Sequence, residues 1–247
     1  AGQPSFYGIL STEALGRQYS WPKAATPVTA AELARIQVAP EARRVLALYR
    51  LDLRTEALRE WNWALRNADD RSLLAAAELA RRNGLYDRAI TAAGRTRNEH
   101  DYAVRYLAPY YDIFAREAQN QNLDLAWVFG LVRQESLFQS VARSGVGAQG
   151  LMQVMPATGK WIAKKQGWGN YHPGWLTGID TNVQLGSAYL RHVLDLLSQN
   201  QVMAAAGYNA GPGRPRRWRD SKPMEGAIYA ETIPFPETRD YVKKVMS

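Results

Sequence analysis

The residue best suited to chemistry is Glu135, a glutamate near the middle of the chain that is followed directly by Ser136. Val128, Leu131 and Val132 precede it at helical spacing, and Glu135 lies seven residues after Val128 on the same apolar face. A carboxylate on such a face is costly to bury unless it has a partner or a purpose. A carboxyl group half buried at the wall of a groove stays protonated more readily than one in water. Glu135 is therefore a candidate general acid.

A glycine-rich segment follows at residues 144–150, with the sequence Ser-Gly-Val-Gly-Ala-Gln-Gly, and leads into an apolar stretch that contains Gln153 and Met155. Glycine permits a positive φ angle or a close approach of the backbone, which suits a chain that borders a polymer-binding groove. A tight connection between two helices needs the same residues. On this segment alone, the simple connection is the favoured interpretation.

Two later segments combine polar side chains with breaks in helical structure. Residues 206–213, Ala-Gly-Tyr-Asn-Ala-Gly-Pro-Gly, place Tyr208 and Asn209 at the end of a predicted helix. Residues 231–241, Glu-Thr-Ile-Pro-Phe-Pro-Glu-Thr-Arg-Asp-Tyr, predict an extended stretch that leads into a final helix capped around Thr238. Taken separately, such a tyrosine is most often a core residue and such an asparagine a helix stop.

The composition excludes several other kinds of site. The chain has 247 residues, no cysteine and three histidines, so disulfides and thiolate metal sites are excluded. No two histidines lie four residues apart, which excludes a zinc site of the HExxH kind, and neither a metal nor a cofactor is predicted. No apolar run is long enough to span a bilayer.

The chain is basic, with a net charge of +8 that fits an acidic partner: a nucleic acid, a membrane surface or an anionic polymer such as cell wall. The basic residues are spread along the chain apart from four arginines, Arg214, Arg216, Arg217 and Arg219. A solvated face explains these arginines better than a nucleic-acid site does. No nucleic acid is therefore expected as a partner.

The spacing of the apolar residues predicts an all-α fold, because strand signals are scarce. The opening, residues 1–27, is expected to be irregular or to form short helices. Further helices are expected over residues 103–121, 122–138, 156–167, 181–197 and 204–208.

Residues 30–94 show helical periodicity and contain two similar stretches. Leu-Arg-Thr-Glu-Ala-Leu at 53–58 and Leu-Tyr-Asp-Arg-Ala-Ile at 85–90 are offset by 32 residues, a spacing typical of helix–turn–helix repeats. A free-standing solenoid needs about three repeats, so this part is predicted to be the end of a longer helical array. We place this superhelical region and linker at residues 1–104 and a second domain at residues 105–247.

Together, four motifs agree in order and spacing with those of one family. Glu135-Ser136, residues 144–156, Tyr208-Asn209-Ala210-Gly211-Pro212 and residues 231–241 resemble the motifs of the soluble lytic transglycosylases. The resemblance covers residues 105–247. One difference is visible: family members often carry Asn-Pro soon after the Glu-Ser pair, where this chain has Gln139-Ser140. The upstream helices and Ser5-Phe6-Tyr7-Gly8 are similar to the superhelix and linker of large members.

The resemblance implies a catalytic domain like goose lysozyme that cleaves the β-1,4 bond between MurNAc and GlcNAc in peptidoglycan without hydrolysis, leaving a 1,6-anhydroMurNAc end. Glu135 would be the only catalytic group, first as acid at the glycosidic oxygen and then as base at the muramyl C6 hydroxyl. Ordinary glycosidases use two carboxyl groups, but no acidic residue lies between Glu135 and Asp180. The N-acetyl group of the substrate is expected to stabilise the charge at C1 instead.

The resemblance also assigns substrate-binding positions along the groove, namely Ser144, Gln153, Met155, Tyr208 and Glu231. Tyr208 is expected to hydrogen-bond Glu135 or the N-acetyl group. Asn209 is expected to hold its loop, and Glu237 and Arg239 are given structural roles as an ion pair.

The implied partners are glycan strands and muropeptides of peptidoglycan, together with proteins of cell-wall assembly, and no membrane span is expected. The implied location is periplasmic, in the bacterial cell envelope, with the signal peptide absent from this chain.

Three other functions stay open on the residues alone. A hydrolytic lysozyme or chitinase shares the chemical class and differs in its product. A non-enzymatic wall-binding scaffold needs no acid on an apolar face, so Glu135 argues against it. A nucleic-acid binder rests on the basic charge alone.

Overall fold

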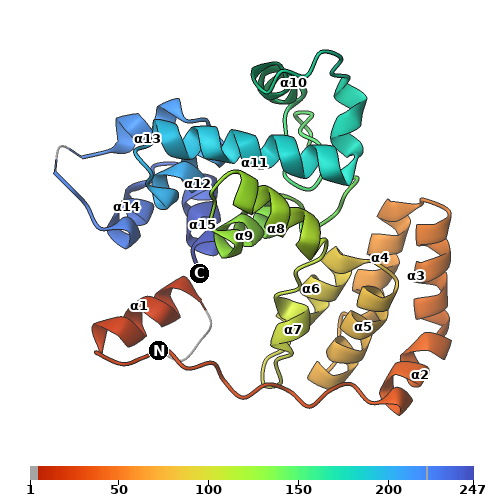
Figure 1. Ribbon diagram of the computed structural model, residues 1–247. Helices are drawn as coiled ribbons and strands as arrows, with labels where there is room; N and C mark the ends of the chain where they lie inside the picture. The colour runs from red at the N-terminus through yellow and green to blue at the C-terminus, as the bar shows by residue number, and fades with distance from the viewer. Residues whose placement is uncertain (1–4, 221) are drawn as a thin grey trace. The chain divides into compact units, whose positions relative to one another are not determined.

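The computed structural model describes residues 5–220 and 222–247, and these residues form an all-α fold, as the apolar periodicity predicts (Figure 1). Residues 1–4 of the predicted opening segment lie outside the described residues. The helices are α1 (Phe6–Ala14), α2 (Ala30–Val38), α3 (Pro40–Arg50), α4 (Arg54–Ala64), α5 (Asp70–Arg82), α6 (Tyr86–Gly94), α7 (Tyr102–Arg105), α8 (Tyr111–Asn120), α9 (Leu125–Ser136), α10 (Pro156–Lys165), the 3-10 helix η1 (Pro173–Thr177), α11 (Ile179–Leu196), α12 (Gln201–Ala210), α13 (Gly213–Trp218), α14 (Gly226–Thr232) and α15 (Pro236–Val245). None of the described helices is long and apolar enough to cross a membrane.

The chain divides into two compact units. Trp21–Leu107 forms one, called here the hairpin unit, and residues 5–20 with Ala108–Ser247 form the other, called the C-terminal unit. The division after Leu107 lies close to the boundary expected between residues 104 and 105. The opening residues, which were expected with the helical array, group instead with the C-terminal unit.

The 32-residue repeat is visible in the hairpin unit as two helical hairpins, α3–α4 and α5–α6 (Figure 1). Each hairpin turns at a residue with positive φ, Asp52 at 57° and Gly84 at 71°. The leucine that follows has nearly the same backbone angles in both turns: φ is −83° and ψ is 64° at Leu53, and φ is −89° and ψ is 66° at Leu85. The sequence similarity therefore reflects one turn geometry used twice.

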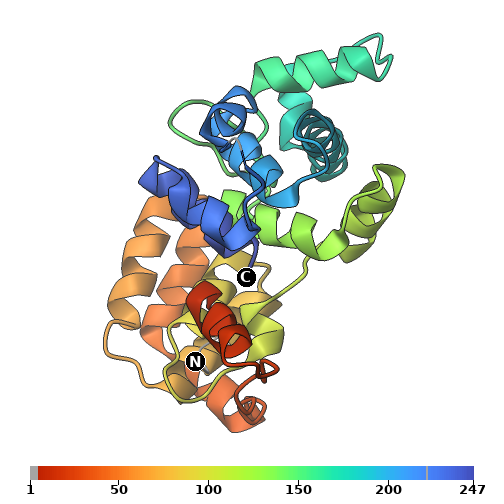
Figure 2. The same cartoon turned by 90° about the vertical axis from the view of Figure 1, so that its left-hand side faces the viewer.

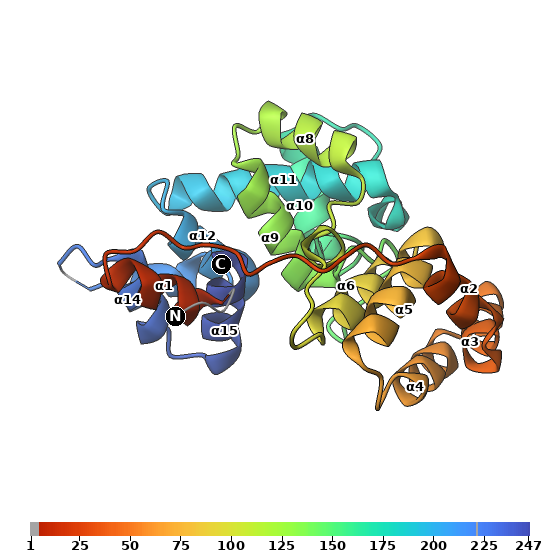
Figure 3. The same ribbon diagram turned by 90° about the horizontal axis from the view of Figure 1, so that it is seen from below.

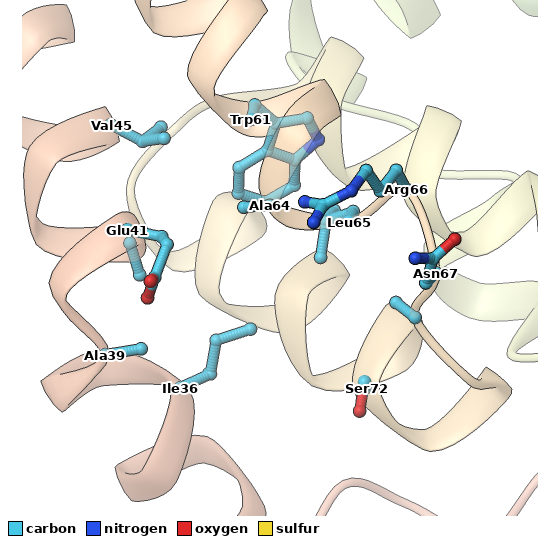
Figure 4. Close-up of a pocket in the computed structure, with 12 residues that line it drawn as sticks. Ile36, Ala39, Glu41, Val45, Trp61, Ala64, Leu65, Arg66, Asn67 and Ser72 are labelled. Atoms are coloured by element: carbon cyan, nitrogen blue, oxygen red, sulfur yellow. The ribbon is translucent and has the colours of Figure 1, made fainter.

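The hairpin unit also contains a pocket of about 350 Å³ between α2, α3, α4 and the start of α5 (Figure 4). Ile36, Val45 and Trp61 give it apolar walls, and Trp61 is only 4% exposed. Arg66 lies at the edge of the pocket. Its guanidinium donates to the backbone carbonyl oxygen of Trp63 at 2.7 Å and lies 3.7 Å from the centre of the Trp63 indole ring. The pocket is thus a gap in an apolar helix interface.

In the C-terminal unit, α9 forms as its sequence predicts. The side chain of Asp124 caps its first turn by accepting from the N–H of Trp127 at 2.7 Å. Val128, Leu131 and Val132 are fully buried, so the apolar face seen in the sequence is the core face of the helix. Glu135 therefore lies at the end of a helix whose position is set by core packing.

Two helix predictions were wrong in detail. The single helix expected over residues 103–121 is split into α7 and α8, because Pro109 lacks an N–H and disfavours helical backbone at the residue before it. Thr238 does not cap the last helix, since α15 begins at Pro236. The Thr238 hydroxyl is buried and donates to Oδ1 of Asn209 at 2.7 Å, which joins α15 to the end of α12.

Helix α1 packs against α14 and α15 within the C-terminal unit (Figure 3). The Tyr7 hydroxyl donates to Oε1 of Glu231 at 2.5 Å, and the Lys243 ammonium donates to the Tyr7 oxygen at 2.9 Å. Lys243 also lies 3.2 Å from the Glu231 carboxylate. These contacts explain why residues 5–20 belong to this unit.

The close approach of α9 to α15 depends on Gly130, and it yields a first prediction. A Cβ atom on Gly130 would lie 2.6 Å from the carbonyl oxygen of Val245, so the helices must separate to accept it. We predict that Gly130→Ala lowers the free energy of unfolding by about 1–3 kcal/mol in urea titrations. The control is Gly145→Ala, whose Cβ would meet nothing within 4 Å. Equal stability of the two variants would contradict the packing described.

Candidate active site

Glu135 lines a cleft of about 610 Å³ in the C-terminal unit, between the loop that follows α9 and the helices α12 and α15. In Figure 2 this loop, in green, and the dark-blue helix that ends at the C-terminus lie on the same side of the unit. The lining residues are Gln134, Glu135, Ser144, Val146, Ala148, Gln153, Met155, Tyr208, Asn209, Glu237, Asp240, Tyr241 and Lys244.

Four of the five positions expected to bind substrate thus meet at one cleft with Glu135, namely Ser144, Gln153, Met155 and Tyr208. Glu231 is not among the residues that line it. Its carboxylate is engaged by Tyr7 and Lys243, and its pKa is lowered by the hydrogen bond from Tyr7 first and by Lys243 in addition.

Among the residues that the structure describes, the carboxyl group of Glu135 has one side-chain hydrogen-bond partner, Tyr241. The Tyr241 hydroxyl donates to Oε1 of Glu135 at 2.6 Å. Burial raises the pKa of Glu135 to about 7 from its ordinary value of 4.5, and the hydrogen bond from Tyr241 opposes part of that rise. A large fraction of Glu135 is therefore protonated at neutral pH, as a general acid must be.

Tyr208 does not make the expected bond to Glu135. Its hydroxyl donates to the carbonyl oxygen of Met152 at 2.7 Å, which fixes the ring against the segment just before α10. Tyr241, a residue of the 231–241 motif with no role predicted from the sequence, makes that bond instead. The pairing was not predictable from spacing, because Tyr241 and Glu135 lie 106 residues apart and meet only through the packing of α9 on α15.

The glycine-rich loop is held by hydrogen bonds of one side chain on α9 and of side chains within the loop. Ser136 donates to the carbonyl oxygen of Leu151 at 2.7 Å, so the residue next to Glu135 ties the loop to α9. Ser144 accepts from the N–H of Ala148 at 2.9 Å. Gln153 donates to the carbonyl oxygen of Gly150 at 2.8 Å. Of the Glu-Ser pair, Glu135 is thus the candidate acid, and Ser136 anchors the loop that forms another wall of the cleft.

Asn182 on α11 is a second anchor of the loop, and it was not predicted from the sequence. Its buried amide accepts from the N–H of Met152 and donates to the carbonyl oxygens of Gln149 and Leu176, each at 2.8 Å. Gly150 lies against it with φ of 76°, and a Cβ there would be 2.3 Å from the amide nitrogen. The glycine is required by both its φ angle and this close approach.

The cleft also holds two carboxyl groups that were not predicted to lie there. Glu237 and Asp240 on α15 line it, and both are exposed to solvent. Asp240 lies 3.6 Å from the ammonium of Lys243. Among the described contacts Glu237 forms no ion pair with Arg239, which instead donates to the carbonyl oxygen of Glu231 at 3.5 Å. Glu135 therefore differs from its acidic neighbours in its burial.

The arrangement suits proton transfer to and from a ligand, because a buried carboxyl group lines an open cleft. Tyr241 occupies Oε1 of Glu135, which leaves Oε2 as the oxygen to carry the exchanged proton. Tyr208 and Met155 offer a ring and a thioether to an apolar surface of the ligand. In the part of the chain that the structure describes, no group of three or more His, Asp or Glu side chains is placed to hold a metal ion.

A second prediction concerns Tyr241. Because its hydrogen bond lowers the pKa of Glu135, Tyr241→Phe should raise that pKa and move the alkaline limb of the activity profile to higher pH. The loss of a hydrogen bond to a charged group, about 1.5–3 kcal/mol, should also lower kcat by about 10- to 100-fold. The measurement is kcat/KM as a function of pH on a glycan substrate.

The matched control is Tyr229→Phe, which removes a buried hydroxyl that donates to the carbonyl oxygen of Pro215 at 3.3 Å, outside the cleft. Its pH profile should coincide with that of the unmodified chain. If Tyr241→Phe left the profile in place as well, Tyr241 would have no positioning role at Glu135.

Comparison with known proteins matches both parts of the chain to described domains. The Transglycosylase SLT domain matches residues 112–229, and the Soluble lytic murein transglycosylase L domain matches residues 35–101. The soluble lytic murein transglycosylase of Salmonella typhimurium is 31% identical over 98% of this chain, and that of Escherichia coli K12 is 30% identical over 99% of it.

Solved structures of lytic transglycosylases also match the chain over nearly its whole length. An inactive mutant of the lytic transglycosylase Slt from Pseudomonas aeruginosa has a TM-score of 0.88 and 38% identity over 100% of this chain. The 70-kDa soluble lytic transglycosylase of Escherichia coli, in its complex with bulgecin A, has a TM-score of 0.80 and 30% identity over 99% of this chain. The chain spans 38% of the length of the two sequence relatives and 40% of each solved chain.

Proposed function

The chain belongs to the family of soluble lytic murein transglycosylases, and we propose that its cleft binds a glycan strand of peptidoglycan and cleaves it. The observation that carries this proposal is the carboxyl group of Glu135, which is held in an open cleft with a pKa of about 7. A pure binding protein has no need of such a group, because burying a carboxyl group lowers stability.

We propose the MurNAc-GlcNAc β-1,4 bond as the bond that breaks. Protonated Glu135 donates its proton to the glycosidic oxygen as the bond to C1 of MurNAc breaks, and GlcNAc leaves with that proton. The N-acetyl carbonyl oxygen of MurNAc stabilises the positive charge at C1 by forming a bond to it, which takes the place of a second carboxylate. Glu135 is now a carboxylate that still accepts the hydrogen bond from Tyr241.

In the second step the carboxylate of Glu135 accepts the proton of the C6 hydroxyl. The C6 oxygen forms its bond to C1 and displaces the N-acetyl oxygen, which gives 1,6-anhydroMurNAc. Glu135 ends as it began, protonated, and no water enters the products. One residue serves both steps because a pKa of about 7 makes it a competent acid and a competent base near neutral pH.

The remaining cleft residues position the strand. We assign substrate-binding roles to Ser144, Gln153, Met155 and Tyr208, which line the cleft around Glu135. Glu231 lies beside α1, where we propose that it contacts the peptide or saccharide after exchanging its bond with Tyr7. The hairpin unit is proposed to be the end of a longer helical array that positions the C-terminal unit on glycan strands in the periplasm or on proteins of cell-wall assembly.

A hydrolytic lysozyme is the second candidate, and it is favoured by one observation. Glu237 and Asp240 line the cleft, and a second carboxylate is what a hydrolytic glycosidase uses to activate water or to attack C1. Hydrolysis and the non-hydrolytic reaction differ in the acidic residues that they need. Hydrolysis needs one of these acids as much as it needs Glu135, whereas the non-hydrolytic reaction needs neither.

A third prediction separates these functions. Glu135→Gln should lower the cleavage of purified peptidoglycan by about 10²- to 10⁴-fold and leave folding intact, because the amide cannot donate or accept the proton. Glu237→Gln and Asp240→Asn serve as controls, and each should retain activity within a few fold. Mass spectrometry should find products lighter by one water than reducing-end fragments. Reducing-end products, together with loss of activity in a control variant, would replace the proposal with hydrolysis.

A fourth prediction concerns pH. The first step requires protonated Glu135, and burial raises its pKa to about 7. As pH rises through 7 the acid is lost, so kcat/KM should fall by about tenfold per pH unit on the alkaline side. Initial rates in buffers from pH 5 to 9 test this. A profile that is flat from pH 6 to 9 would show that Glu135 is not the acid.

A further inference from the structure

Aromatic side chains continue from the cleft across α12, α11 and α10. We call Tyr208, Tyr189, His192 and Trp161 the aromatic band. The rings of Tyr208 and Tyr189 lie 5.3 Å apart between centroids, and those of His192 and Trp161 lie 4.7 Å apart with the planes inclined at 70°. Tyr189 and His192 are three residues apart on α11, so their side chains are neighbours on one helix face.

The band is connected to the cleft at two points. Tyr208 lines the cleft and contacts Tyr189. Met155 also lines the cleft and is the N-cap residue of α10, the helix that carries Trp161. A ring contact and one helix therefore link the cleft around Glu135 to the side chains of the band on α10 and α11.

The outer end of the band is exposed and carries hydrogen-bond donors. The Trp161 side chain is exposed, at 43%, and Tyr189 and His192 are less exposed than Trp161. The ammonium of Lys165 lies 3.3 Å from Nδ1 of His192 and 5.6 Å from the centre of the Trp161 ring. An exposed indole edged by an ammonium and an imidazole offers an apolar face beside polar groups.

We propose that the aromatic band extends the substrate cleft and binds a further sugar of the glycan strand, beyond the sugars at Glu135. This inference rests on the proposed function. The apolar C–H face of a sugar ring lies against Trp161, while Lys165 and His192 donate to hydroxyl or N-acetyl oxygens of the same sugar. Such side chains combine a large apolar surface with polar atoms at the edge, as sugars do. A glycan is the ligand proposed here because Tyr208, the inner residue of the band, also lines the cleft that holds Glu135.

The test compares Trp161→Ala with a matched control, Trp175→Ala. Trp175 is 48% exposed and lies on η1 in the same unit, outside the band. The substrates are a short peptidoglycan fragment that spans only the sugars at Glu135 and long glycan strands. Trp161→Ala should raise KM for long strands by about three- to tenfold with little change in kcat, and should change KM for the short fragment less. Trp161→Phe, which keeps a ring, should restore most of the loss.

Binding measured in the Glu135→Gln background separates this inference from the proposed function. Long strands should bind the Glu135→Gln, Trp161→Ala double variant about three- to tenfold more weakly than the Glu135→Gln variant. That result would support the band even if the unmodified chain cleaved no peptidoglycan. The inference would be overturned if the Glu135→Gln variant and the double variant bound long strands with equal affinity. It would also be overturned if Trp175→Ala weakened the binding of long strands as much as Trp161→Ala does.

Discussion

The hydrogen bond from Tyr241 to Glu135 is the contact on which the site depends, because it exists only where α9 and α15 meet. Core packing of Val128, Leu131 and Val132 fixes one helix. Gly130 lets the other approach so closely that a Cβ would not fit. The result is a carboxyl group held at the wall of a cleft by a residue 106 positions away in the chain, with Oε1 engaged by the Tyr241 hydroxyl.

Holding that carboxyl group in this position lowers stability. Its pKa is about 7 in the folded chain against an ordinary value of 4.5. Below pH 4.5 the group is neutral in both states and adds no penalty. As pH rises towards 7 the unfolded chain releases its proton and the folded chain retains it, which favours unfolding by up to about 3 kcal/mol. The hydrogen bonds of Ser136 and Asn182 to the backbone of the neighbouring loop hold the wall of the cleft in place despite this penalty.

Local patterns in the sequence predicted local structure, whereas contacts between distant segments were not predictable. The apolar face of α9 and the 32-residue repeat follow from side-chain spacing, and both are present. The break at Pro109 also follows from the sequence, because proline disfavours helical backbone at the residue before it. By contrast, the roles of Tyr241 and Asn182, and the place of Glu237 and Asp240 in the cleft, depend on how the helices pack. The spacing of residues in the sequence cannot predict these roles and positions. The same residue type at the same helical position can pack in the core, anchor a loop or hydrogen-bond a catalytic group.

The central claim is that burial alone keeps Glu135 protonated near neutral pH, and the direct test is the titration of that one carboxyl group. The side-chain carboxyl carbon of Glu135 can be followed by ¹³C NMR from pH 3 to 9 and assigned by its absence in Glu135→Gln. The account predicts a midpoint near 7, well separated from those of the exposed glutamates. A midpoint near 4.5 would contradict it, because Glu135 would then be ionised in the cleft and have no proton to give.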